Sequence, residues 1–169
     1  MASYSMQNGS DIMLFSYTSS GYKSIAHGTS HTLNLSADTE DINTKDSGIF
    51  GLTEVNKINW SISAEHMYTN EGYSTFFNTM VDKKPVTVCF GLKADAEMGP
   101  NGTPTDVNIS SAGNWTPQAS SYIYSGMAII TSLDWSADAG SKSTVSVELQ
   151  GQGAIKEGRY DGTSVAWKP

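Results

Sequence analysis

Alternation of apolar and polar residues is the feature of this sequence that most constrains its fold. Successive side chains of a β-strand point to opposite faces, so alternation predicts strands with one buried and one wet face. From Ile58 to His66 every second residue is apolar or aromatic, with Trp60 and Ile62 near the centre. His31 to Asp38 shows the same pattern, with Leu35 on the predicted buried face. The chain is therefore expected to be mainly β. Further strands are expected over residues 11–17, 22–27, 86–93, 122–138 and 143–150.

One segment alone has helical spacing. Its apolar residues recur at i, i+3, i+4, i+7 and i+8 and form a single stripe of about two and a half turns. Asn70 is the expected N-cap, and Pro85 prevents the helix from continuing into the next strand. The stripe is expected to pack on the sheet. It consists of Tyr73, Phe76, Phe77, Met80 and Val81.

Two long polar segments interrupt these patterns. Thr39 to Asn56 is rich in charge, and Ala94 to Ser121 is rich in Gly, Pro, Ser, Thr and Asn. Loops longer than about 12–15 residues are uncommon in compact domains unless they have a role. Gly151-Gln152-Gly153 is interpreted as a turn at a strand end. Because neither a linker nor a tandem repeat is visible, residues 1–169 are expected to form one domain.

The charge of the chain argues against nucleic-acid binding. It has 10 basic and 17 acidic residues and a formal net charge of −7, whereas affinity for phosphates comes chiefly from Lys and Arg. Cys89 is the single cysteine and has no disulfide partner within the chain, which fits synthesis in a reducing compartment. Neither a signal peptide nor an apolar run of about 18 residues is visible, so we expect no secretion signal and no membrane insertion.

Catalytic and metal-binding motifs are equally scarce. The sequence has neither a Gly-x-Ser-x-Gly elbow nor a phosphate-binding P-loop. His27 and His31 would lie about 13 Å apart in an extended chain, too far to bind one metal ion. The acidic segment from Asp38 to Asp46 lacks the ligand spacing of an EF-hand loop. We therefore expect no enzyme activity, no cofactor and no metal site.

Acidic residues occupy the polar positions of the alternating strands, among Ser, Thr, Asn and Gln. Lys57, at a strand entrance, is the single cation at these positions. The sequence leaves open whether this acidic wet face is an ordinary solvent-exposed surface or one with a function. Its carboxylates are Asp38, Glu65, Asp134 and Glu148.

Three stretches have an order and spacing that are informative in combination. The first is Thr44-Lys45-Asp46-Ser47-Gly48, and the second is the strand from Lys57 to His66, which contains Asn59-Trp60-Ser61-Ile62. The third is the run from Ser125 to Leu133 followed by Thr144 to Gly153, which ends in Gln-Gly-Gln-Gly. From about residue 22 to residue 155 the chain thereby resembles the tail tube proteins (major tail proteins) of long-tailed bacteriophages.

The resemblance implies an antiparallel β-sandwich or partial barrel flanked by one α-helix, with long loops for subunit assembly. It implies a structural virion protein, made in the host cytoplasm and located in the tail. Six copies would form a ring, and stacked rings would form a tube through which DNA is ejected into the host. The partners would be further copies, tail tip or baseplate proteins and a terminator protein.

Particular residues acquire expected roles from this resemblance. Asp38, Glu65, Asp134 and Glu148 would face the lumen of the tube, where like charge keeps DNA from sticking. Residues 39–56 would form the long loop that reaches the neighbouring ring, with Asp41, Lys45 and Asp46 as its candidate contact residues. The insert at residues 94–121 matches nothing in the family pattern and has no assigned role.

The sequence also leaves open an alternative function. A β-sandwich module of a virion that binds carbohydrate or a receptor would use exposed aromatic residues as a stacking platform. Trp115, Tyr122 and Tyr124 are the candidates for such a platform. Binding of a glycan by the soluble monomer would distinguish this function from tube formation.

Overall fold

The computed structural model describes residues 9–18, 21–25, 28–94 and 115–169. Within them the chain is mainly β with one α-helix, as expected. Residues 95–114, most of the expected insert, lie outside the described residues, and so does His27.

Among the described residues no helix is long and apolar enough to cross a membrane. The elements are a 3-10 turn at Gly9–Asp11, β1 Ile12–Thr18, β2 Gly21–Ser24, β3 Gly28–Asp41, β4 Thr53–Met67, α1 Asn70–Val81, β5 Val86–Leu92, β6 Tyr122–Ser136, β7 Thr144–Tyr160 and β8 Val165–Trp167.

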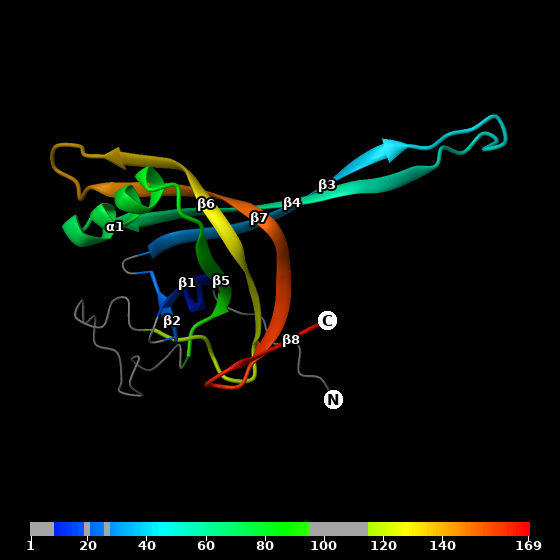
Figure 1. Cartoon of the computed structure of the whole chain (residues 1–169). Coiled ribbons are helices and arrows are strands. Elements are labelled where there is room, and N and C mark those ends of the chain that lie inside the picture. The colour runs from blue at the N-terminus through cyan, green and yellow to red at the C-terminus, as the bar shows by residue number, and fades with distance from the viewer. Residues whose placement is uncertain (1–8, 19–20, 26–27, 95–114) are drawn as a thin grey trace.

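All strands belong to one antiparallel sheet with the order β2-β1-β5-β6-β7-β4-β3, and β8 pairs with the far end of β7. The sheet is not closed into a barrel. Strands β6 and β7 are long and curved, and they run through both halves of the molecule (Figure 1). One half contains β3 and β4, and the other contains β5, β1 and β2. The long strands thus join two layers of one continuous sheet.

The main core lies on one face of β4 and β7, between the two layers of the sheet, and Tyr73 and Phe76 of α1 pack against it. Trp60, Ile62, Ala64 and His66 of β4 are buried at alternate positions, which confirms the predicted buried face over this stretch. The prediction is wrong for Ile58 and for Leu35 of β3, which are exposed. Other members of this core are Leu14, Val88, Ala128, Ile130, Val145, Val147 and Leu149.

Trp60 fixes the position of β7. Its indole Nε1 donates a hydrogen bond of 2.9 Å to the carbonyl of Gly153. A Cβ atom at Gly151 or at Gly126 would overlap the indole ring, so glycine is needed at both positions. The interpretation of residues 151–153 as a turn at a strand end is therefore wrong, because they lie inside β7, which continues to Tyr160.

The helix begins one residue earlier than expected. Thr69, with an extended backbone, is the N-cap, and its Oγ1 accepts a hydrogen bond from the Gly72 N–H. Asn70, the predicted cap, is the first helical residue. The apolar stripe packs on the sheet only in part, because Tyr73 and Phe76 contact the core whereas the other three residues are exposed. Those three are Phe77, Met80 and Val81.

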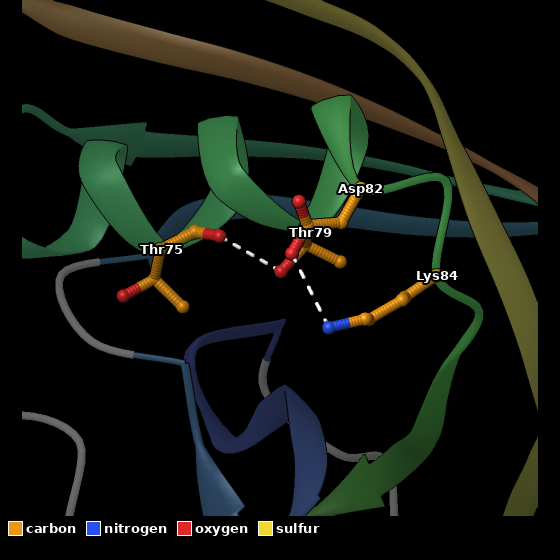
Figure 2. Close-up of polar contacts among 4 residues, drawn as sticks. All are labelled: Thr75, Thr79, Asp82 and Lys84. Carbon is orange, nitrogen blue, oxygen red and sulfur yellow. Dashed lines mark hydrogen bonds and ion pairs between the residues drawn. The ribbon is translucent and has the colours of Figure 1, made fainter.

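Figure 2 shows two polar contacts at the end of α1, one within the helix and one just beyond it. Thr79 Oγ1 donates a hydrogen bond of 2.8 Å to the carbonyl of Thr75, one turn earlier. Just beyond the helix, Lys84 Nζ lies 3.3 Å from the carboxylate of Asp82. Both members of this pair are exposed, so it contributes little to stability.

The environment of His31 predicts that acid destabilises the fold. Its ring lies 5.5 Å from that of His66, and desolvation by burial lowers the pKa of His31 below its ordinary value of 6.5. The folded state therefore prefers the neutral ring. This preference contributes stability in full above pH 6.5 and is lost as the pH falls through the lowered pKa.

We expect the free energy of unfolding to decrease when the pH falls from 7.5 to 5. Urea unfolding at both pH values, followed by circular dichroism, measures the change. A His31→Gln variant, which cannot be protonated, is the matched control and should lose less stability over the same interval. An equal loss in both proteins would contradict the assignment to His31.

Candidate functional site

Two surfaces stand out on the half of the molecule built from β3, β4, β7 and β6. The first is the polar face, which is the side of these strands opposite to the main core. It contains all four acidic residues expected at the lumen, and all four are exposed. The polar face comprises Thr32, Asn34, Ser36 and Asp38 of β3, Lys57, Asn59, Ser61, Ser63 and Glu65 of β4, Ser146, Glu148 and Gln150 of β7, and Ile129, Ser132 and Asp134 of β6.

The strand register brings three of these carboxylates close together. Ser146 of β7 pairs with Glu65 on one side and with Asp134 on the other, so these residues form one row across three strands. Glu148 lies in the next row, between Ser63 and Ser132. Since neighbouring strands are about 4.8 Å apart, Glu65 and Asp134 stand about 10 Å from each other along their row.

Asp38 lies apart from this group, further along β3. It pairs with Lys57 across the strands and accepts a hydrogen bond of 2.9 Å from the Asn59 side chain. The spacing of the carboxylates is comparable with the Debye length at physiological salt, about 8 Å, so their mutual repulsion is weak in water. The net negative charge of the polar face therefore costs the folded state little electrostatic energy.

The second surface is the hairpin arm, residues 35–59, where β3 and β4 continue beyond the last β4–β7 pair (Figure 1). The two strands pair as far as Asp41 and Thr53, about 20 Å beyond Leu35. The expected loop at residues 39–56 is therefore wrong in extent, because only residues 42–52, the arm tip, are loop. The outer part of the arm is a two-stranded ribbon that packs on no core. Its residues therefore need not alternate between apolar and polar, and the sequence pattern does not reveal the strands.

The arm tip is held by its own hydrogen bonds. The N–H of Thr44 donates to Ser47 Oγ at 2.7 Å, and the N–H of Leu52 donates to Asn43 Oδ1 at 2.7 Å. Lys45 and Asp46 lie exposed in this loop, and Asp41 stands at its base. The structure therefore brings the three expected contact residues to the outer end of the arm.

The arm also exposes apolar residues that the sequence reasoning passed over. Ile49 is 93% and Phe50 is 79% exposed at the arm tip. Exposed apolar groups of this size, gathered on one projection, are typical of a protein interface. Two apolar residues in a row inside a charged segment are the signal that could have revealed them. The remaining large apolar residues exposed on the arm are Leu35, Ile42, Leu52, Val55 and Ile58.

Two strand edges of this half of the sheet have no partner strand among the described residues. Strand β3 pairs only with β4. Strand β6 pairs with β5 as far as Ala128, so residues 129–136 pair only with β7. Unpaired edges offer a row of backbone donors and acceptors to another chain.

The aromatic residues of the alternative function do not form one platform. Trp115 packs with Phe15, Cys89 and Ile123, and the Lys93 ammonium lies 4.6 Å from the centre of its ring. Tyr122 and Tyr124 flank Ile123 in β6, so their side chains point to the other face of the sheet. This arrangement does not favour a carbohydrate-binding surface made of these three residues.

Comparison with known proteins places this fold among phage tail proteins. No model of a protein family matches the chain, and no curated protein sequence matches it. Its structure is similar to the tail of an empty gene transfer agent particle refined with C6 symmetry, with a TM-score of 0.63 and 16% identity over 89% of this chain and 97% of that one. It is also similar to the SPP1 tail tube, with a TM-score of 0.63 and 10% identity over 92% and 81% of the two chains. The baseplate of the anti-feeding prophage is similar with a TM-score of 0.56 and 11% identity over 93% and 97%. The chain therefore has a phage tail tube-like fold, as its sequence resemblance implied.

Proposed function

We propose that the protein is a structural subunit of a tail tube, located in the virion, whose copies form hexameric rings that stack into a conduit for DNA ejection. The observation that carries this proposal is the combination of a tail tube-like fold with an exposed polar face, bounded by two strand edges that have no partner strand among the described residues. Tail tip or baseplate proteins and a terminator would cap the tube at its ends.

The strand directions support closure of a ring. Strands β3, β4, β7 and β6 are antiparallel to their neighbours, so β3 and β6 run in opposite directions. The outer edge of β3 in one copy can therefore pair with residues 129–136 of β6 in the next and continue the antiparallel pattern. Repetition of this contact around a ring would leave no edge exposed. The C6 symmetry of the similar gene transfer agent tail is the reason for choosing six copies.

Such a closed sheet would have the polar face on one side throughout. We assign this side to the lumen, because the opposite side is occupied by the core and α1. Asp38, Glu65, Asp134 and Glu148 would then repeat around the channel. Lys57 stands beside Asp38 on this face, so the excess of carboxylates gives the channel wall mainly the same sign of charge as phosphate, and such a wall offers DNA few favourable contacts.

Reversal of charge on the polar face tests this assignment. In a triple variant with Glu65→Lys, Asp134→Lys and Glu148→Lys, tubes are expected to form normally, while ejection of DNA becomes slower at low salt and recovers at high salt. Each lysine that meets a phosphate would add about 0.9 to the slope of log affinity against log salt. The ejection rate as a function of ionic strength is the measurement.

Asp138→Lys is the control, because this residue lies exposed in the connection between β6 and β7, away from the polar face. Its ejection rate should equal that of the unmodified protein. If the triple variant ejected DNA as fast as the control at every salt concentration, the lumen would have to be assigned to another surface.

A further inference from the structure

The exposed half of the apolar stripe of α1 continues into a larger patch. Tyr73 joins its parts, since its ring centre lies 6.3 Å from that of Phe77 and 5.2 Å from that of Trp135. Phe77 is 49%, Val81 is 60% and Trp135 is 51% exposed. We call these three residues and Met80 the helix patch. Tyr68 stacks on one face of the Trp135 ring at 4.4 Å, and the rest of the patch is open within the described part of the chain. Exposed aromatic surface of this kind is typical of an interface.

The helix patch and the arm tip lie at opposite ends of the molecule. In Figure 1, α1 and the connection between β6 and β7 are at one end of the long sheet, and the arm tip is at the other. When identical subunits stack in the same orientation, one end of each copy meets the opposite end of the next, which gives a heterologous interface that can repeat without limit. Stacking along this axis therefore brings an arm tip toward a helix patch.

The two surfaces also match in chemistry. The segment from Glu40 to Glu54 contains four carboxylates and one lysine around the apolar residues Ile49 and Phe50. Both signs of charge stand around the helix patch. Lys84 is paired with Asp82 just after α1, next to Lys83, and the connection between β6 and β7 carries both Lys142 and Asp138. What the two surfaces share is exposed apolar area, and its burial would supply the affinity.

We propose that the arm tip of one copy docks on the helix patch of a copy in the adjacent ring, with Phe50 against Phe77 and Val81. This inference rests on the proposed tube function and adds to it the surface that receives the arm. Preformed hydrogen bonds within the arm tip lower the entropy lost on docking, because the loop is already ordered.

Disulfide trapping between two full-length variants tests the contact. One chain carries Phe50→Cys and the other carries Val81→Cys, so any mixed dimer must join two copies. A disulfide requires Cα atoms within about 7 Å, which makes the test specific for this pair. Native Cys89 does not interfere, because it is fully buried and burial raises its pKa to about 12. The control chain carries Thr163→Cys, at an exposed position in the turn before β8.

After mild oxidation of the concentrated mixture, the mixed dimer of Phe50→Cys with Val81→Cys should exceed the dimer with Thr163→Cys by roughly tenfold or more, owing to effective concentration at the interface. Electron microscopy of the same sample reports tubes separately. Tubes without this excess would overturn the docking site and leave the tube function standing. An excess without tubes would support the contact and argue against the tube. Absence of both would reject both.

Discussion

Replacement of Trp60 by alanine is expected to lower the free energy of unfolding by about 3–5 kcal/mol, the cost of removing a large buried aromatic side chain. Trp60 is 3% exposed and belongs to the main core. The variant would also lose the hydrogen bond from Nε1 to the Gly153 carbonyl. Urea unfolding followed by circular dichroism measures the effect, since Trp fluorescence would itself change.

The same contact can be tested from the side of β7. Gly151→Ala places a methyl group where the Trp60 ring lies, and overpacking of this kind costs about 1–3 kcal/mol. In the Trp60→Ala background the added methyl has room, so most of that cost should disappear. Gly51→Ala is the control, because a Cβ atom there meets nothing closer than 3.7 Å. Equal costs of Gly151→Ala in both backgrounds would contradict the packing of Trp60 on Gly151.

Removal of the arm tip is expected to abolish stacking and leave the fold intact. Asp41 and Thr53 are cross-strand partners, so residues 42–52 can be replaced by Asn-Gly, which forms a tight two-residue turn. The tip makes no contact with either core cluster, so the melting temperature should change little. Electron microscopy should show rings or single subunits in place of tubes. Tubes of normal length from this variant would contradict a role for the arm in stacking.

Sequence alternation predicts the strands well where one face packs on a core and fails where the chain leaves it. The stretch from Trp60 to His66 is buried at alternate positions, as predicted. Leu35 and Ile58 continue the same alternation on the arm, where no second layer covers them. Periodicity in the sequence shows that one face of a strand is apolar. It does not show whether another layer of the protein buries that face.

The remaining differences arise from contacts that local sequence does not contain. Glycines at 151 and 153 are typical of a turn, but both lie inside a strand. The indole of Trp60, some ninety positions earlier, leaves no room for a side chain at Gly151, and the backbone at Gly153 has a φ of 80°, which favours glycine. Thr69 and Asn70 are both good N-caps, and spacing does not choose between them. Alternation did indicate that each of the four carboxylates lies on the polar side of its strand. Which of them are neighbours across the sheet depends on the strand register, which alternation does not give.

Negative-stain electron microscopy of the purified, concentrated protein is the most direct test of the central claim, that this chain is a tube-forming subunit. The proposed function predicts hollow rings with six-fold symmetry and tubes built from stacked rings. Only small, solid particles in the same concentrated sample would contradict it.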